Sequence, residues 1–115
     1  MKIVKATANL TPVDIYKLCM NPNAAKMKDI AGQRLEVDRF ALYEDIDKKT
    51  GEVQNILAIK TREGEVFATN SRTFIEEFVK MVDFFEGYNM EVGAIGIVKG
   101  NSKNGREFIT CTYAE

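Results

Sequence analysis

A single amphipathic helix between two groups of strand-like segments is the feature that most limits the folds open to this chain. From Thr73 to Phe85, large apolar residues recur at helical spacing, so we assign Phe74, Phe78 and Phe85 to the core. Thr73 followed by Glu76 predicts a capping box at the helix start. Three segments before the helix and two after it have the residue pattern of strands. The predicted strands are Arg34–Tyr43, Glu52–Thr61, Glu65–Thr69, Met90–Lys99 and Arg106–Tyr113.

The predicted order is strand, strand, strand, helix, strand, strand, which is the order of the OB-fold. We therefore expect a mainly β chain with helices, in which residues 33–115 form a five-stranded OB-fold-like barrel. A slip in the alternation near Asp38–Arg39 favours the barrel, because a β-bulge there would bend one strand across two of its sides. An α+β roll with an open sheet has a similar string of elements and remains the alternative.

The N-terminal segment carries helix signals in place of strand signals. Thr11-Pro12-Val13-Asp14 combines a capping residue, a proline suited to the first turn and an acid at the positive end of the helix dipole. The predicted helix runs to about Met20, where Asn21-Pro22-Asn23 ends it, and a second short turn is expected over residues 24–30. Residues 1–32 are therefore predicted to be a helical extension of one domain that spans residues 1–115.

Composition argues against an enzyme, a metalloprotein or a membrane protein. The chain of 115 residues has no histidine, so it lacks the commonest general base and the commonest metal ligand. Cys19 and Cys111 are too far apart in sequence to suggest a metal site, and we expect both to be reduced and buried. No apolar stretch has the length of a membrane span. We expect a cytoplasmic binding protein without catalytic residues, metal or cofactor.

Two local patterns that could suggest other chemistry fail on spacing. Asp45 and Asp47 lie where a calcium loop would begin, but Thr50 and Ile56 occupy the positions at which that loop needs a glycine and a bidentate glutamate. A nuclease would need clustered carboxylates for Mg²⁺, and these aspartates are the only near pair outside the helix. The glycines of residues 93–100 lie in and after a strand, and not before a helix as in a phosphate-binding loop.

The basic residues are unevenly distributed, although the formal net charge is only −1. Residues 1–34 hold six basic and two acidic residues, a surplus of four positive charges. The predicted hairpin turn between the last two strands carries Lys99, Lys103 and Arg106, which could pair with the phosphates of a nucleic acid. Lys60 and Arg62, at the second hairpin, could assist them. An ordinary soluble turn with surface charges is the alternative.

Binding of single strands also uses aromatic side chains that stack on bases. Tyr43, Phe67 and Phe108 are the candidates, because Phe67 and Phe108 alternate with residues expected to face inward. The predicted nucleic-acid site thus comprises Tyr43, Lys60, Arg62, Phe67, Lys99, Lys103, Arg106 and Phe108. For each ring taken singly, packing in the core is the alternative.

Several segments resemble the small single-stranded-DNA-binding proteins of tailed phages that infect Gram-positive bacteria. The resemblance lies in Glu65–Phe74 and Gly100–Cys111, with further similarity in Met27–Gln33 and Ala41–Asp45. It implies a replication accessory that coats unwound DNA with little sequence preference, protects it from nucleases, and works in the host cytoplasm with replication proteins as further partners. The residues leave a second hypothesis open, an adaptor that binds a partner protein in its groove or at a strand edge.

Overall fold

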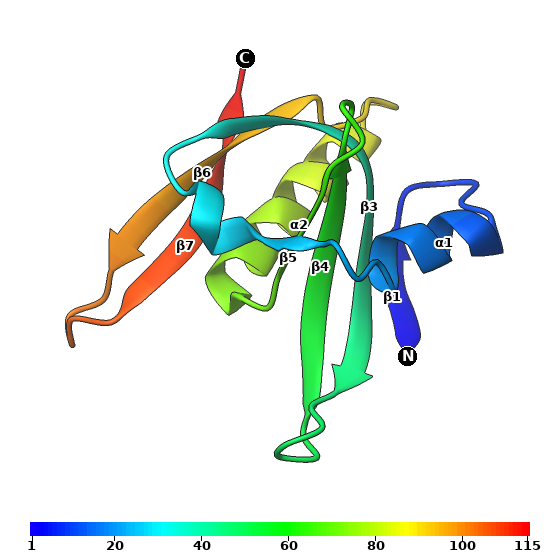
Figure 1. Cartoon of the computed structure of the whole chain (residues 1–115). Helices are drawn as coiled ribbons and strands as arrows, with labels where there is room; N and C mark the ends of the chain where they lie inside the picture. Colours follow the sequence, from blue (N-terminus) through cyan, green and yellow to red (C-terminus); the bar gives the residue numbers. More distant parts are fainter.

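Seven strands, two α-helices and one 3₁₀ helix make up the computed structural model, which describes all residues from 1 to 115 (Figure 1). Their bounds are β1 (Lys2–Ala6), α1 (Pro12–Cys19), β2 (Ala25–Lys26), the 3₁₀ helix η1 (Met27–Ile30), β3 (Arg34–Ile46), β4 (Val53–Thr61), β5 (Val66–Thr69), α2 (Arg72–Glu86), β6 (Ala94–Asn101) and β7 (Glu107–Ala114). Neither α-helix is long and apolar enough to cross a membrane.

Strand β3 is the element around which the sheet curls. Its first residues, Arg34–Glu36, pair with β6, whereas the rest of the strand pairs with β4. The register shifts between Val37 and Arg39, which confirms the bulge predicted at this point. A bulge increases local twist and bends the strand, so β3 takes part in two sections of sheet that face different directions.

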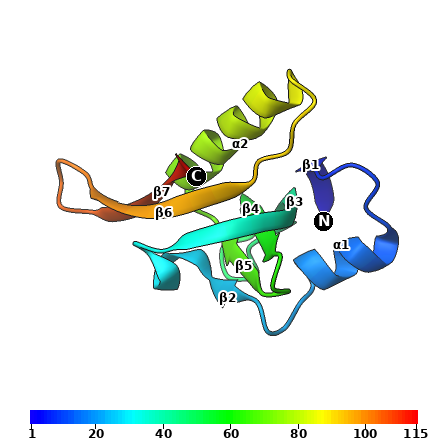
Figure 2. The same cartoon turned by 90° about the horizontal axis from the view of Figure 1, so that it is seen from above.

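The strand order is β2-β5-β4-β3-β6-β7, and β1 pairs with β3 off this path. Seen from above, the sheet curls through roughly half a barrel, with α2 over one side and α1 at the N-terminal end (Figure 2). No ladder of hydrogen bonds joins β2 or β5 to β7. The protein is therefore mainly β, with two helices and a half-barrel sheet that is consistent with an OB-like fold.

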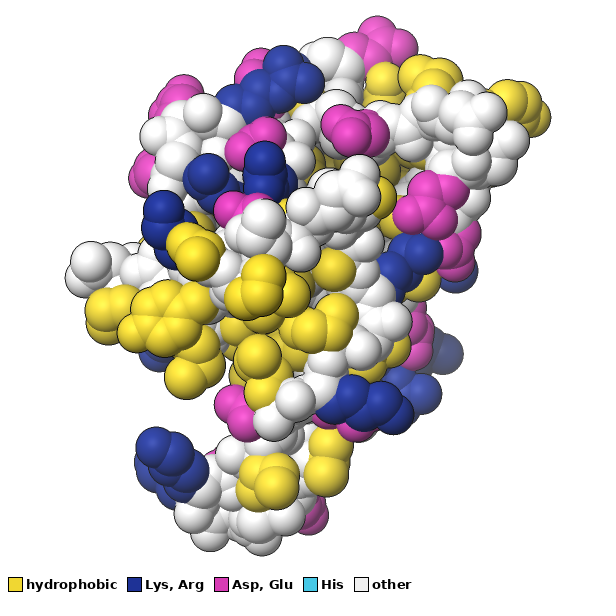
Figure 3. All heavy atoms as spheres, turned by 90° about the vertical axis from the view of Figure 1, so that its right-hand side faces the viewer, with side chains coloured by type: hydrophobic (Ala, Val, Ile, Leu, Met, Phe, Trp, Pro, Cys, Tyr) yellow, Lys and Arg dark blue, Asp and Glu magenta, His cyan; other side chains and the backbone are white.

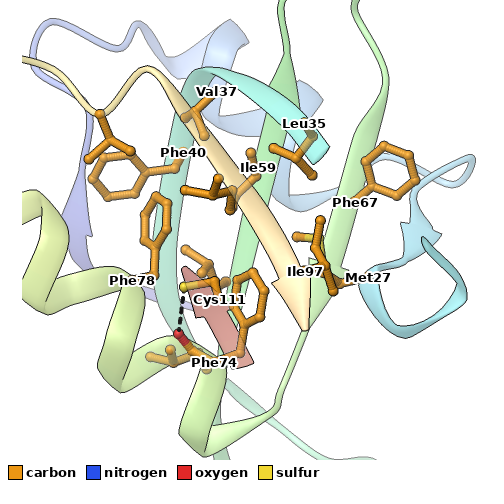
Figure 4. Close-up of a cluster of buried hydrophobic side chains, with 14 of the residues drawn as sticks. Met27, Leu35, Val37, Phe40, Ile59, Phe67, Phe74, Phe78, Ile97 and Cys111 are labelled. Atoms are coloured by element: carbon orange, nitrogen blue, oxygen red, sulfur yellow. Dashed lines mark hydrogen bonds between the residues drawn. The ribbon is translucent and has the colours of Figure 1, made fainter. Parts of the chain in front are cut away.

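The main core lies between the concave side of the sheet and α2. Phe74, Phe78 and Val82 of α2 are buried there, as their helical spacing predicts. The ring of Phe78 meets that of Phe40 edge to face, with centroids 5.1 Å apart (Figure 4). Burial of each such ring contributes about 2–3 kcal/mol to folding, so α2 is held in place mainly by its aromatic stripe.

A smaller apolar cluster covers the opposite face of the sheet. Leu18 of α1 packs there with Tyr43 of β3 and Val66 of β5, and Ala41 and Ala58 complete the cluster. The small side chains of the two alanines let α1 lie close to the sheet. Strands β3, β4 and β5 are consequently buried on both faces along part of their length.

The N-terminal residues are not a purely helical extension, which corrects the prediction for residues 1–32. Lys2–Ala6 form β1, which pairs antiparallel with β3, and Ala25–Lys26 form β2, which pairs parallel with β5. The segment Lys2–Ala6 is too short to show clear alternation. A strand nevertheless forms there because the free edge of β3 offers unpaired backbone groups that β1 satisfies.

The start of α2 also differs from the prediction. Ser71 is the N-cap, and its hydroxyl oxygen accepts a hydrogen bond from the amide of Phe74. Thr73 lies inside the first turn, so the capping box predicted from Thr73 and Glu76 is wrong. The Ser71 hydroxyl also donates to the carbonyl oxygen of Ile109 at 2.9 Å, which ties the helix start to β7. This second hydrogen bond joins residues that are far apart in sequence, so the local sequence pattern could not predict it.

We predict that Ser71→Ala lowers the free energy of unfolding by about 1–2 kcal/mol, because it removes a helix cap and leaves the Ile109 carbonyl without its donor. Thr73→Ala is the matched control, since Thr73 caps nothing, and it should change stability by less than about 0.5 kcal/mol. Urea unfolding followed by circular dichroism measures both. Equal losses in the two variants would contradict the assignment of Ser71 as the cap.

Candidate nucleic-acid interface

A groove of about 1060 Å³ lies between the β6–β7 hairpin and the edge of the sheet formed by β4 and β5. The hairpin extends away from the body of the protein, so the groove lies where the half-barrel is open (Figure 1). Residues of η1 border it on one side, and the segment that leads from β5 into α2 borders it on another. Its lining comes from residues 26–29, 54, 56, 68–73, 99, 102 and 106–109.

Positive charge is concentrated in this groove. Five cationic side chains line it against two carboxylates, although the whole chain has a net charge of −1. The cations are Lys26, Lys28, Arg72, Lys99 and Arg106, and the carboxylates are Asp29 and Glu107. Among the cations, only Arg72 and Lys99 form ion pairs, with Glu76 at 2.9 Å and Glu107 at 3.4 Å. Three cations are therefore free to meet an anionic ligand.

Uncharged hydrogen-bonding groups lie between these cations. Thr69, Asn70, Ser71 and Thr73 reach the groove where α2 begins, together with Gln54 of β4. The Asn70 side-chain amide donates to the Gln54 side-chain oxygen at 3.4 Å. The first turn of α2 has no acidic residue, so the positive end of its dipole adds to the field of the cations. This part of the groove is suited to phosphate and sugar oxygens.

Phe108 is the one aromatic residue in the groove lining. It lies opposite Gly100 in the β6–β7 ladder, and its ring covers that glycine so closely that a Cβ at Gly100 would come within 2.6 Å of it. The side chain is only partly buried. The absence of a side chain at Gly100 therefore leaves room for the outer end of the Phe108 ring against the backbone of β6.

Comparison with known proteins agrees with this geometry. A family model described as phage single-stranded DNA-binding protein matches residues 2–113. The chain belongs to this family. A single-stranded DNA-binding protein from Bacillus phage B103 is 24% identical over 113 residues, covering 93% of each chain. No solved structure matches. The family consists of DNA binders and not of enzymes, as the lack of histidine predicted.

In this phage single-stranded DNA-binding protein, the six site residues predicted at the two hairpins fall into two groups. Lys99, Arg106 and Phe108 line the groove, and Lys103 is exposed in the turn at the end of the same hairpin. Lys60 and Arg62 lie elsewhere, at the far end of β4 from the groove residues Gln54 and Ile56. The prediction of one basic surface from both hairpins is therefore wrong for Lys60 and Arg62. Their partners are Asp38 at 3.8 Å and Glu36 at 4.0 Å.

Two of the three predicted stacking residues are buried. Phe67 is 8% exposed and belongs to the main core with Met27 and Leu35 (Figure 4). Strand alternation predicted that Phe67 faces solvent, but both faces of β5 are covered. Val66 packs in the smaller cluster, and η1 packs against β5 on the side of the main core. Phe67 is therefore too buried to stack on a base.

Tyr43 is 6% exposed and lies beneath α1 in the smaller cluster. Its hydroxyl donates to the carbonyl oxygen of Cys19 at 3.4 Å. Burial, with smaller contributions from Cys19 and Asp45, raises the pKa of the Tyr43 phenol to about 12. Tyr43 is thus a core residue, and its prediction as a stacking residue is wrong.

Sequence reasoning missed three cations of the groove, namely Lys26, Lys28 and Arg72. The surplus of positive charge in residues 1–34 was the available signal for the two lysines. It did not show that β2 pairs with β5 and leads directly into η1, which brings Lys26 and Lys28 to the groove. Arg72 carried no signal, because its position depends on where α2 begins.

We predict that Tyr43→Phe makes stability less sensitive to alkali. The folded-state pKa lies above the ordinary value of 10.0, so the folded protein holds this proton more tightly than the unfolded chain does. The stabilisation is complete below pH 10.0 and is lost as the pH rises to about 12. Urea unfolding across this range should show a decline smaller by about 2 kcal/mol in the variant. An unchanged decline would contradict burial of the phenol.

Proposed function

We propose that the groove between the β6–β7 hairpin and the β4–β5 edge is the path of single-stranded DNA. Membership of the phage single-stranded DNA-binding family establishes the ligand class. The location of the DNA path is supported by one observation: five cations line a single groove of a chain whose net charge is −1. A polyanion is drawn to the place where local positive charge is greatest.

The binding mode follows from the kinds of side chain present. Lys26, Lys28 and Arg106 have no ion pair to give up, so each can neutralise a phosphate and release a counterion. The hydroxyl and amide groups at the start of α2 bind sugar and phosphate oxygens. Phe108 stacks on one base from the hairpin. Lys103, beyond the groove at the tip of the hairpin, guides the strand as it leaves.

Such a site reads the backbone and not the bases. Phosphate contacts position a nucleic acid without carrying sequence information, and an aromatic ring stacks on any base. This supports a protein that coats and protects single-stranded DNA of any sequence during replication or recombination. We place this activity in the cytoplasm of the phage host, with replication proteins as further partners.

A more specific assignment of the fold, to the OB-fold, supports the same DNA path. In order along the chain, β3, β4, β5, α2, β6 and β7 correspond to the strand, strand, strand, helix, strand, strand order of an OB-fold. The groove lies on the second and third of these strands and beside the last hairpin, the surface at which OB-folds commonly bind oligonucleotides. The alternative, an adaptor that binds a partner protein in its groove or at a strand edge, has no comparable support, because the family to which the chain belongs binds single-stranded DNA.

We predict that the triple variant Lys26→Ala, Lys28→Ala, Arg106→Ala binds oligo-dT more weakly and with a weaker dependence on salt. Each lost phosphate contact removes about 0.7 from the slope of log affinity against log salt, so the slope should fall by about 2. Fluorescence anisotropy with labelled oligo-dT at a series of salt concentrations measures it.

The matched control is Lys60→Ala, Arg62→Ala, which also removes cations but none from the groove. It should leave affinity and salt slope close to those of the unmodified protein. If the control lost as much affinity as the groove variant, the DNA path would have to run over the far end of β4.

A separate prediction concerns stacking. Phe108→Leu keeps an apolar side chain over Gly100 but removes the aromatic face, so oligo-dT affinity should fall by about 1–3 kcal/mol with little change in salt slope. Anisotropy over the same series of salt concentrations measures affinity and slope, and circular dichroism of the free protein distinguishes lost stacking from a disturbed hairpin. Unchanged affinity would show that Phe108 only packs.

A further inference from the structure

Exposed apolar side chains gather at the end of α2 and in the turn that follows it. Phe84 and Tyr88 are 61% and 67% exposed, and the centroids of their rings lie 5.4 Å apart. Met90 is 55% exposed, and Tyr113 of β7 is 53% exposed. The ring of Phe85 meets that of Phe84 edge to face, and its centroid lies 5.5 Å from that of Tyr113. We call Phe84, Tyr88, Met90 and Tyr113 the α2-end patch, and contiguous exposed rings of this kind mark an interaction surface.

The α2-end patch is anchored to the main core. The amides of Tyr88 and Met90 both donate to the carbonyl oxygen of Phe85, at 3.0 and 2.9 Å. The side chain of Phe85 packs against the main core, and Val92, two residues after Met90, is buried in it. The patch is therefore ordered before a partner arrives, which lowers the entropic cost of binding.

Acidic side chains lie beside the α2-end patch. Residues 83–91 contain three acids, Asp83, Glu86 and Glu91, and no cation. Lys5 of β1 pairs with two of them, because its Nζ lies 3.0 Å from Asp83 Oδ1 and 3.2 Å from Glu86 Oε2. Three carboxylates against one ammonium leave a surplus of two negative charges. Acidic and hydrophobic side chains lie together at the upper right of the molecule in Figure 3, where the turn after α2 lies.

This negative charge decides which ligands suit the α2-end patch. It repels the phosphates of DNA and the headgroups of anionic lipids, because like charges placed together cost free energy. The patch also shares no residue with the groove proposed for DNA. Aromatic rings edged by carboxylates are instead complementary to a segment that combines apolar side chains with lysine or arginine, since ring faces attract cations as well.

We propose that the α2-end patch binds a basic amphipathic segment of a partner protein. Apolar side chains of that segment pack on Phe84, Tyr88 and Met90, and its lysine or arginine side chains pair with Glu86 and Glu91. Because the patch lies outside the groove, the partner can be held by a protein molecule that has single-stranded DNA bound.

Two designed peptides of opposite charge test the proposal on the full chain. Each has about 18 residues with leucine at helical spacing along one face, and the other face carries lysine in the basic peptide and glutamate in the acidic peptide. Fluorescence anisotropy of the labelled peptides should show that the unmodified protein binds the basic peptide about tenfold more tightly than the acidic one. Equal affinity for the two peptides, or no binding of the basic peptide, would overturn the proposal.

Substitutions in the α2-end patch test whether the basic peptide binds there. Phe84→Ser removes an exposed ring and should weaken binding of the basic peptide about tenfold. Glu91→Lys should also weaken it and should strengthen binding of the acidic peptide, because it reverses the charge beside the patch. The matched controls are Val53→Ser and Glu52→Lys, since both residues are exposed at the β3–β4 hairpin and outside the patch. Equal losses in the patch variants and the controls would contradict the proposed site.

Two further measurements test other occupants of the patch. Oligo-dT affinity should be the same for Phe84→Ser and the unmodified protein, and a loss would assign the patch to DNA and overturn the proposal. A change in the sedimentation of the protein alone on Phe84→Ser would show that a second copy covers the patch, which would overturn it too. The triple variant of the groove should keep its affinity for the basic peptide, so failure of the patch and failure of the DNA groove are distinguishable.

Discussion

The bend in β3 is the constraint on which the rest of the structure depends. Because the strand shifts register between Val37 and Arg39, its two halves can pair with β6 and with β4 at the same time. The β6–β7 hairpin is thereby held at an angle to β4 and β5 and never pairs with β5. Helix α2 fills the resulting concavity with Phe74, Phe78 and Val82. The part of the concavity beyond the start of α2 is not filled by the helix, and it forms the groove.

The groove is chemically unlike the core beside it. Five cations and several hydroxyl and amide groups line it, and Phe108 is its one aromatic side chain. The DNA binding proposed for the groove would depend on electrostatic attraction to the nucleic-acid backbone more than on stacking against several rings. This makes local charge the relevant quantity, because a chain with a net charge of −1 can still present a strongly positive surface where its cations converge. Overall charge is a poor guide to nucleic-acid binding in so small a protein.

The N-terminal segment contributes more than its short elements suggest. Strand β1 pairs with the free edge of β3, α1 buries the outer face of the sheet through Leu18, and η1 brings Lys28 to the groove. The segment thus forms a second layer over the half-barrel and supplies two of the groove cations. The outer side of α1 stays exposed.

The sequence by itself determined the kind and order of the main elements, the bulge at Asp38–Arg39 and the aromatic stripe of α2, because these depend on local spacing and turn residues. It also identified the basic hairpin with Lys99 and Arg106, since hairpin residues stay together in any fold. Only the tertiary structure decided that Phe67 and Tyr43 are buried, that Lys60 and Arg62 lie away from the groove, and that Lys26 and Lys28 lie in it. Alternation along a strand shows that neighbouring side chains point to opposite faces. Whether each face meets solvent or another layer depends on how elements distant in sequence, here α1 and η1, pack against the sheet.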